Sequence, residues 1–465
     1  MNKKKIDLRQ PELYLKSNSQ KYSQVQMQHA EHLGEQYRKE KKALKKKTEL
    51  KKTLSKQFKT MESHEKTEEI KQQLKIINDK TKKIKLSLKK IEADILNSFV
   101  TDLFKKNTLP PQFSSRKNKP LTSIIKIIEL DEYFFSEWDH YVNAHPNATI
   151  YHSLNIKRVI DKTFGHRSCY LIAISHTSEI CGIYPLINQA SIVFGNLWTS
   201  LPYFNYAGVL ADNKLIEKAL IEYAWEKLKI SGCHYVETRQ SHLIEDKPVR
   251  DEKISMVLRL PKTVELLQSA IGAKLRAQIN KTKAYNIQFK VGREDLLDDF
   301  YRVFSIKMRD LGTPVYAKSL FLNMLVENPN AKIVSAYINN QVTSVGFIIG
   351  WRNTLEIPWA STLSEANQFN SNMALYWHIL KLAIEEQYEF FDFGRSSKDS
   401  TTYQFKKQWG AEEHQLYWHY SLPDQSPLPA INNNNPKYKL AISIWKRLPV
   451  WLTQIIGPCI VKYIP

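Results

Sequence analysis

Residues 332–349 read KIVSAYINNQVTSVGFII and decide the class of fold. The sequence predicts strands from Lys332 to Ile338 and from Val342 to Ile349. Two asparagines between such segments, here Asn339-Asn340, are typical of a tight β-hairpin turn. The sequence predicts a helix from about Ser371 to Glu386 and a strand from Phe390 to Arg395. A hairpin followed by a helix and a further strand is typical of an α/β domain.

The same arrangement occurs earlier in the chain. Two segments of alternating pattern, Cys169 to Ala173 and Ile180 to Ile187, precede a predicted helix from about Lys214 to Ile230. A strand from Tyr235 to Arg239 follows this helix. The repetition predicts two similar α/β halves, with a substrate cleft between them.

Two details of the copies also match. The second strand of each predicted hairpin contains a glycine, Gly182 in the first copy and Gly346 in the second. Each final strand contains an acidic residue, Glu237 in the first copy and Asp392 in the second. These positions are therefore predicted to be equivalent in the two halves.

The charge is concentrated at the two ends of the chain. The 465 residues include 68 Lys+Arg and 47 Asp+Glu, which gives a net charge of +21. Residues 1–100 contain 26 basic and 13 acidic residues, and residues 426–465 contain five basic and no acidic residues. Such ends indicate contact with nucleic acid or anionic lipid, whereas the nearly balanced middle is typical of a soluble enzyme.

Several classes of protein are disfavoured. The first residues lack the apolar stretch of a signal peptide, and no segment of 18 or more apolar residues predicts a membrane span. The four cysteines show no disulfide framework, which fits a reducing compartment. The histidines show no metal-binding spacing, and no phosphate-binding loop occurs. We expect a cytoplasmic protein with no metal and no tightly bound cofactor.

The first hundred residues predict two long helices. Between about residues 20 and 98 there is no proline, and an apolar heptad pattern runs through the second half. The polar segment from Glu62 to Thr67 is suited to a connection, so we expect an antiparallel coiled-coil hairpin. Its lysines greatly outnumber nearby acids and would follow a phosphate backbone. The alternative is a dimerisation coiled coil with a solvated basic face. The lysines predicted to bind tRNA are Lys45, Lys46, Lys47, Lys82, Lys83 and Lys89.

This segment resembles a known RNA-binding module. Residues Ile6 to Leu13, IDLRQPEL, followed by the predicted hairpin with Leu54-Ser55-Lys56, are similar to the N-terminal tRNA-binding arm of seryl-tRNA synthetases. That resemblance implies that the hairpin grips a tRNA. None of the catalytic motifs of the synthetases follows it.

The rest of the chain, from about residue 124, resembles the FemAB family. The stretches that carry the resemblance include SLPYFNYAG at 200–208, MRDLGTP at 308–314, FDFGRS at 391–396 and YQFKKQWGA at 403–411. The similarity is greatest to FemAB-like proteins that accompany exosortase/PEP-CTERM surface-polysaccharide systems. It implies an α/β fold with two tandem GCN5-related N-acyltransferase-like domains, here preceded by the long antiparallel α-helical hairpin.

These observations predict five segments. They are a basic coiled coil (1–104), a linker (105–123), a first acyltransferase-like domain (124–265), a second such domain (266–425) and a basic amphipathic tail (426–465). The tail mixes aromatic, aliphatic and basic residues, which suits an interface with anionic lipid. Packing of the tail on its own domain is an equal alternative. The expected location is therefore cytoplasmic, with peripheral contact at the inner face of the membrane.

The resemblance implies transfer of an acyl group to an amine. The first hypothesis is an aminoacyl-tRNA-dependent aminoacyltransferase that acts on a cell-envelope or exopolysaccharide precursor. The second is an acyl-CoA-dependent N-acyltransferase of an amino sugar, with the coiled coil used for assembly. The third is a scaffold without activity. The co-substrate is accordingly aminoacyl-tRNA or acyl-CoA.

Two residues are predicted to be catalytic. Lys406 occupies the Phe-Lys-x-x-Trp-Gly position of the family, which implies that it polarises the ester carbonyl or holds the tRNA end. The alternative for Lys406 is a surface lysine beside a buried Trp409. Asp392 ends a predicted strand, where site residues are common, and its alternative is a structural pair with Arg395.

Six further residues are predicted to bind substrate. A loop rich in aromatic residues suits a sugar, and arginines at strand or helix ends suit phosphate. Loop packing and solvated basic surfaces are the alternatives. The predicted residues are Tyr203, Asn205, Arg239, Arg276, Arg395 and Ser396.

Overall fold

The chain forms two units, residues 1–108 and residues 109–465. A computed structural model describes residues 24–59, 64–100, 124–176, 178–191, 195–423, 426–429 and 436–464. The predicted linker at 105–123 and the stretch from Ile6 to Leu13 lie outside the described residues.

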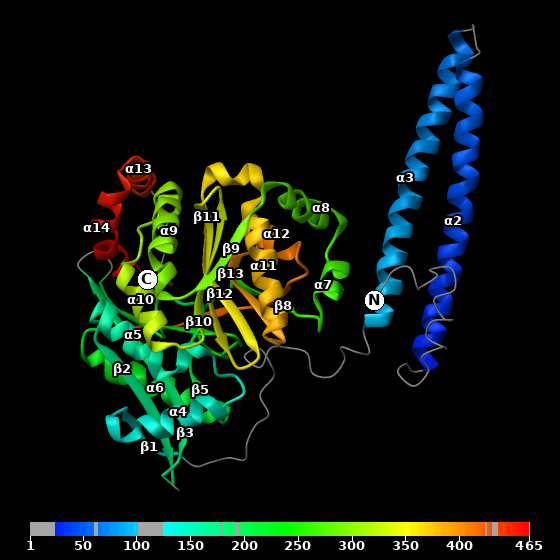
Figure 1. The fold of residues 1–465 in the computed structure, drawn as a ribbon. Coiled ribbons are helices and arrows are strands. Elements are labelled where there is room, and N and C mark those ends of the chain that lie inside the picture. The colour runs from blue at the N-terminus through cyan, green and yellow to red at the C-terminus, as the bar shows by residue number, and fades with distance from the viewer. Residues whose placement is uncertain are drawn as a thin grey trace. The chain divides into compact units, whose positions relative to one another are not determined.

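The first unit is a helical hairpin, as the sequence predicted. Helix α2 (Gln24–Lys59) and helix α3 (His64–Val100) lie side by side and contact each other along their length (Figure 1). Helix α3 begins at His64, so most of the segment predicted as a connection is helical. The apolar seam is buried between the helices at Leu33, Tyr37, Ile70, Ile77, Leu88 and Ile91.

The second unit contains two mixed β-sheets. The first has the strand order β1-β2-β3-β4-β6-β15-β7, with β5 paired to β3. Its strands are β1 (Ile124–Glu129), β2 (Ser168–Ser175), β3 (Ile180–Ser191), β4 (Gly195–Thr199), β5 (Leu210–Ala211), β6 (Tyr235–Gln240), β7 (Val249–Arg250) and β15 (Tyr417–Ser421). Within it, β4 and β6 are parallel and the other pairs are antiparallel.

The second sheet repeats this arrangement in the order β14-β8-β13-β12-β11-β10-β9. Its strands are β8 (Lys253–Arg259), β9 (Gln288–Gly292), β10 (Ala331–Ile338), β11 (Gln341–Trp351), β12 (Thr354–Thr362), β13 (Phe390–Ser397) and β14 (Glu412–Gln415). Here β12 and β13 form the parallel pair. Each half therefore has one parallel pair inside an otherwise antiparallel sheet.

The β-hairpin predicted for residues 332–349 is confirmed. Strands β10 and β11 pair antiparallel, and the turn residues Asn339 and Asn340 have φ angles of 49° and 62°. Two successive positive φ angles characterise the two-residue turn whose twist matches a β-hairpin. The predicted helices also form, as α6 (Lys214–Ile230) and α11 (Ser371–Glu385).

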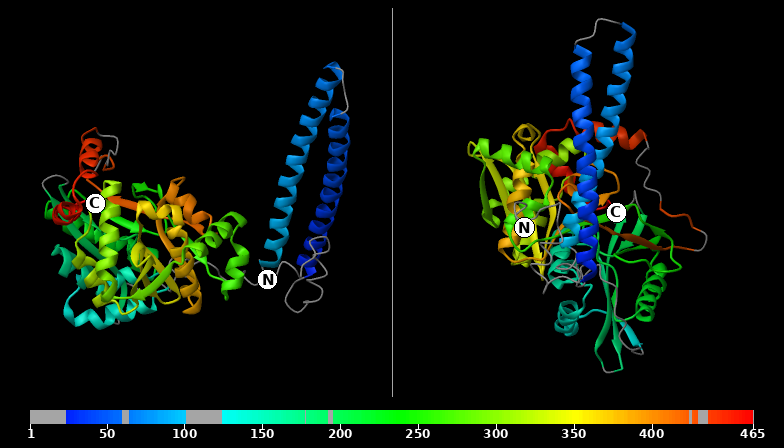
Figure 2. Two further views of the ribbon diagram at one scale, coloured as in Figure 1. Left: turned by 45° about the horizontal axis from the view of Figure 1, so that its top comes forward. Right: turned by 90° about the vertical axis from the view of Figure 1, so that its right-hand side faces the viewer.

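Further helices cover the sheets (Figures 1 and 2). Helix α6 packs on β2 and β3, whereas α11 packs on β10, β11 and β12. The largest apolar core joins the two halves, since it includes both Trp138 and Trp359. The other helices of this unit are α4 (Phe135–Ala144), α5 (Leu154–Phe164), α7 (Val264–Ala270), α8 (Ala273–Thr282), α9 (Leu297–Leu311), α10 (Lys318–Glu327), α12 (Thr401–Lys407), α13 (Pro436–Trp445) and α14 (Val450–Val461), with short 3-10 turns between them.

The two sheets exchange strands across the predicted boundary between the first domain (124–265) and the second domain (266–425). Strand β8 precedes this boundary but pairs with β13 and β14 of the second sheet. Strand β15 lies within the predicted second domain but pairs with β6 and β7 of the first sheet. The chain therefore crosses between the halves twice.

The matched glycines let each helix approach its sheet. A Cβ atom on Gly182 would lie 2.7 Å from Ile216 Cγ2 and 2.9 Å from a methyl carbon of Leu220, both on α6. A Cβ atom on Gly346 would lie 2.9 Å from a methyl carbon of Ile379 on α11. All three distances are too short for a methyl group, so the glycine has the same packing role in both halves.

Replacement of Gly182 by alanine is expected to lower the free energy of unfolding by about 1–3 kcal/mol, because the new methyl group overpacks the contact with α6. Urea titration measures this effect. Gly272→Ala is the matched control, since a Cβ atom at Gly272 meets no atom within 4 Å. Equal stability of the two variants would contradict the packing argument.

Candidate functional site

The site lies where the parallel strands of the second half diverge. Glu356 on β12 and Asp392 on β13 form the last register pair of the two strands. In the first half, Thr199 on β4 and Glu237 on β6 form the corresponding last pair. The register thus places Glu237 and Asp392 at equivalent positions. Backbone pairing ends beyond these residues, which leaves room for side chains between the strands.

Asp392 is buried and accepts three hydrogen bonds. Its Oδ1 accepts from Ser255 Oγ at 2.8 Å and from the Gly394 N–H at 2.7 Å, and its Oδ2 accepts from Tyr206 Oη at 2.9 Å. The register with β8 shifts between Asp392 and Arg395, and Gly394 has a φ angle of 75° within this bulge. Burial raises the pKa of Asp392, while the three donors oppose this effect.

Glu356 receives both of its hydrogen bonds from the first half. Tyr151 Oη and Asn205 Nδ2 each donate to Glu356 Oε1, at 2.7 Å in both cases. Burial raises the pKa of Glu356 to about 8, and the nearby carboxylate of Asp392 adds to the effect. A carboxyl group with this pKa exchanges protons near neutral pH, as a general base must.

Lys406 completes the buried cluster. It lies in the last turn of α12, a short helix whose start is capped by Ser400. Its Nζ donates to the carbonyl oxygens of Gly394 at 2.8 Å and Arg395 at 2.9 Å. The pKa of Lys406 is lowered to about 8, chiefly by burial and also by the charge of Arg395. The carboxylates of Asp392 and Glu356 oppose this change. The alternative of a surface lysine is wrong, because Lys406 is buried.

Two arginines lie against one tryptophan ring. The Cζ atoms of Arg239 and Arg395 lie 4.6 Å and 5.1 Å from the ring centroid of Trp418. Arg239 Nε donates to Glu237 Oε1 at 2.7 Å, and Tyr420 Oη donates to the other oxygen of Glu237 at 2.8 Å. Arg239 is therefore paired within the first half.

Arg395 differs from Arg239 in this respect. Its Nη1 is buried without a hydrogen-bond partner among the described residues, and so is Ser396 Oγ. Burial lowers the pKa of Arg395 to about 10, with Arg239 as the next cause. A buried guanidinium donor without a partner is suited to an anionic group of a ligand.

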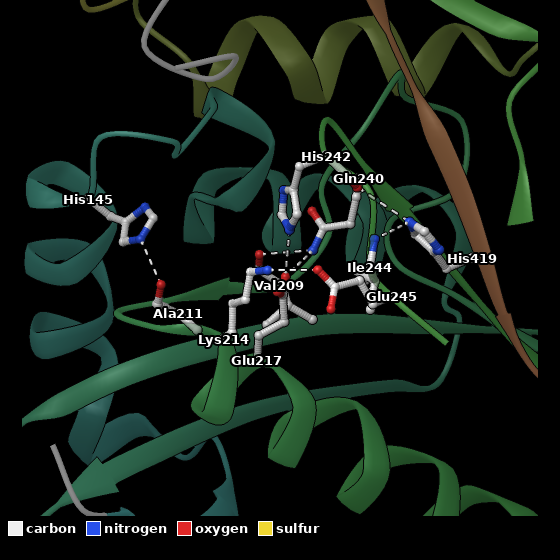
Figure 3. A network of polar contacts seen from close by, with 10 residues as sticks. All are labelled: His145, Val209, Ala211, Lys214, Glu217, Gln240, His242, Ile244, Glu245 and His419. Atoms are coloured by element: carbon white, nitrogen blue, oxygen red, sulfur yellow. Dashed lines mark hydrogen bonds and ion pairs between the residues drawn. The ribbon is translucent and has the colours of Figure 1, made fainter. Parts of the chain in front are cut away.

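A pocket of about 10 Å³, with room for about one water molecule, adjoins this cluster. It shares Tyr206 and Arg239 with the cluster, and its other lining residues belong to the first half: Asn147, His152, Gly208, Val209, Leu210, Gln240, Ser241 and His242. Figure 3 shows Gln240 and His242 pointing toward the carboxylate of Glu217, at 3.1 Å and 2.8 Å. Their polar atoms therefore form a fixed wall of the pocket.

Two of the predicted substrate-binding residues lie elsewhere. The hydroxyl group of Tyr203 lies 2.6 Å from His166 Nε2 and donates to the Lys462 carbonyl at 2.7 Å, so this side chain holds the C-terminal tail. The guanidinium group of Arg276 donates to backbone carbonyls at the end of α7, including those of Gln268 and Ser269 at 3.3 Å. The structure brings together Lys406, Asp392, Asn205, Arg239 and Arg395, with Ser396 next to them in β13.

Glu356, Tyr151 and Tyr206 belong to the site but are not among the residues predicted from the sequence. A signal for Glu356 existed, since it is the one charged residue in the strand segment LEIPWA, and an unpaired charge is rarely buried. Tyr206 lies in the loop rich in aromatic residues, and its hydroxyl group donates to Asp392. Neither tyrosine had a recognisable signal, because its partner lies 186 to 205 residues away in the chain.

Five of the six lysines predicted to bind tRNA have described side chains, and all five are at least partly exposed. Lys45, Lys46, Lys82 and Lys83 are exposed, and Lys47 is partly exposed. The side chain of Lys89 lies outside the described residues. Within the described part of the chain, no group of His, Cys, Asp or Glu side chains is arranged to hold a metal ion.

Comparison with protein-family models gives one match. Residues 271–407 match the acetyltransferase (GNAT) domain, and this range includes Glu356, Asp392 and Lys406. The second half contains a GNAT domain. A search of curated proteins finds no match. With the repeated sheet of the first half, the chain has a tandem GNAT-like fold, as the sequence predicted.

One solved structure supports this fold, and two others are similar over part of the chain. The crystal structure of FemX is 13% identical, with a TM-score of 0.50, and the match covers 68% of this chain and all of FemX. A tandem GNAT protein from the clavulanic acid biosynthesis pathway is 10% identical, with a TM-score of 0.41 and coverage of 65% and 99%. The C-terminal domain of a putative lysylphosphatidylglycerol synthetase from Agrobacterium fabrum is 13% identical, with a TM-score of 0.41 and coverage of 57% and 86%.

Proposed function

We propose that the protein is a FemAB-type N-aminoacyltransferase. It would transfer an amino acid from aminoacyl-tRNA to an amine of a cell-envelope or exopolysaccharide precursor. The observation that carries this proposal is the buried cluster of Glu356, Asp392 and Lys406 at the diverging strands of the GNAT domain. Acyl transfer to an amine requires a proton acceptor and an oxyanion stabiliser, and this cluster offers both.

The residues have distinct roles in the proposed reaction. The neutral amine attacks the ester carbonyl, a C–N bond forms, and the C–O bond to the tRNA ribose breaks. Glu356 accepts the proton of the amine and returns it to the departing ribose oxygen. Two of the three N–H donors of Lys406 hold backbone carbonyls, which leaves one donor for the developing oxyanion. Asp392 fixes the bulge that presents those carbonyls.

The acceptor is proposed to carry an anionic group. Arg395 Nη1 and Ser396 Oγ are buried donors without partners among the described side chains. A phosphate or carboxylate of a sugar-linked precursor would pair with Arg395 and remove the cost of burying an unpaired cation.

The helical hairpin is proposed to bind the tRNA. The decisive experiment is to purify the protein from cells at low salt and to sequence the RNA that accompanies it. Enrichment of one tRNA family, lost when residues 1–100 are deleted, supports the proposal and names the amino acid. Transfer of that labelled amino acid from its tRNA to an envelope extract then tests the reaction.

The basic surface of the hairpin gives a quantitative prediction. The double variant Lys82→Gln and Lys83→Gln is expected to make the plot of log binding constant against log salt concentration less steep by about 2. Each neutralised phosphate contributes about 0.9 to the magnitude of this slope. Filter binding with bulk tRNA measures the slope. Lys218→Gln with Lys262→Gln removes the same charge from exposed positions of the second unit and is expected to leave the slope unchanged. An identical loss in both pairs would contradict hairpin binding.

A second candidate function is N-acylation of an amino sugar from acyl-CoA. The match of residues 271–407 to an acetyltransferase domain favours it. In this case the protein would purify without tRNA, and labelled acetyl-CoA would acylate the acceptor. Release of free CoA in the presence of an amino sugar distinguishes this donor from aminoacyl-tRNA.

A further inference from the structure

We propose that the C-terminal helices bind the surface of an anionic lipid bilayer. The proposal concerns α14 and the basic residues beside it, and it does not depend on which acyl donor the enzyme uses. Helix α14 has the sequence VWLTQIIGPCIV, which contains no charged residue. Lys446 and Arg447 precede it, and Lys462 follows it.

One side of α14 is fixed to the protein. Thr453, Gly457 and Val461 recur every four residues and are buried. A Cβ atom on Gly457 would lie 2.9 Å from the backbone nitrogen of Val315, so the helix packs closely against this segment. Beyond the helix, the Lys462 carbonyl accepts a hydrogen bond from Tyr203. The orientation of α14 on the protein is thereby set.

The opposite side of α14 is apolar and exposed. Trp451 and Ile455 are each 62% exposed, and Cys459 continues the same four-residue spacing. Residue 451 lies about 200° around the helix from residue 453, so this stripe points away from the buried one. Figure 1 shows α13 and α14 beside α9 at one end of the unit. On α13, Leu440 and Ile444 are also exposed at a spacing of four residues.

The positive charge around this apolar stripe indicates which partner covers it. Residues 426–465 contain five basic and no acidic residues. A second copy of the tail would bring like charges together, whereas an anionic lipid surface attracts them. A tryptophan and an isoleucine on one side of a short helix flanked by cations are typical of a helix that lies in the interface. Among the described helices, none is long and apolar enough to cross a bilayer.

The test uses the full-length protein and sedimentation with vesicles that contain about one-third phosphatidylglycerol. The wild-type protein is expected to bind these vesicles and to bind phosphatidylcholine vesicles far less. Trp451→Glu with Ile455→Glu is expected to lower the partition coefficient at least about tenfold, because two apolar anchors are lost. Tyr133→Glu with Ile230→Glu adds the same charge at other exposed apolar positions of the first half and is the control.

Two results would overturn the proposal. If both pairs of substitutions reduced binding equally, net charge alone or the basic hairpin would account for the adsorption. If the Trp451 and Ile455 variant bound vesicles like the wild type but lost a dimer in sedimentation velocity, the stripe would be an interface between copies. Circular dichroism melting curves establish that the variants are folded.

Discussion

Replacement of Lys406 by methionine is expected to reduce kcat/KM for acyl transfer by about 100-fold or more. The substitution removes the donor that faces the developing oxyanion, and loss of one such donor has effects of this size. It also removes the cation beside two buried carboxylates, so the free energy of unfolding is expected to fall by about 3 kcal/mol near pH 8. The transfer assay with the active donor and urea titration measure the two effects.

The neighbouring lysine provides the matched control. Lys407 is exposed, and its Nζ contacts Tyr403 Oη and Glu413 at the surface. Lys407→Met is expected to retain activity near that of the wild type. The decrease in the free energy of unfolding caused by Lys406→Met is expected to be smaller at pH 5. Glu356 is protonated at that pH, so one of the two carboxylates left without a nearby cation carries no charge. Full activity of the Lys406 variant would exclude its catalytic role.

The second large effect is expected for Glu356→Gln. The amide oxygen still accepts from Tyr151 and Asn205, but the side chain no longer takes up a proton. In the wild type, kcat/KM is expected to rise as pH approaches about 8, where Glu356 becomes ionised. At higher pH the rate is expected to fall again, because Lys406, whose pKa is also about 8, loses a donor. The variant is expected to lose this rise and to fall by about 10² to 10⁴ in rate, the usual contribution of a general base.

The same substitution has a signature in stability. Because the folded state holds the Glu356 proton up to about pH 8, it binds more protons than the unfolded chain between about pH 4.5 and 8. Stability contributed by this group therefore decreases with rising pH in that window, by up to about 1.4 kcal/mol per pH unit. Glu356→Gln is expected to flatten this slope, whereas Glu385→Gln, at an exposed position, should not. If the Glu356→Gln variant retained the rise of rate with pH, the base would have to be assigned elsewhere.

The local architecture could be predicted from the sequence because it depends on short-range patterns. The Asn339-Asn340 turn, the two helices after the hairpins and the repeated glycines all follow from spacing and turn chemistry. The equivalence of Glu237 and Asp392 was also predictable, because each lies in the last strand of the repeated hairpin–helix–strand unit.

The site could be predicted only in part because its contacts are long-range. Lys406 and Asp392 lie within the quoted family motifs, whereas the partner of Glu356 is set by a parallel pairing between distant strands. Tyr203 has the composition of a sugar-binding residue and instead holds the tail, which approaches from 259 residues away. The strand exchange was also hidden, because the five residues of β15 have no local preference for either sheet.

That exchange constrains how the protein can be made. Strand β6 ends at Gln240 and β15 begins at Tyr417, so 176 residues must be synthesised before one edge of β6 is covered. At common rates of translation this takes roughly 10 to 35 s. An open strand edge invites pairing with other chains during that interval. The nascent first half is thus a substrate for chaperones, and a cut between the halves would not release two self-sufficient domains.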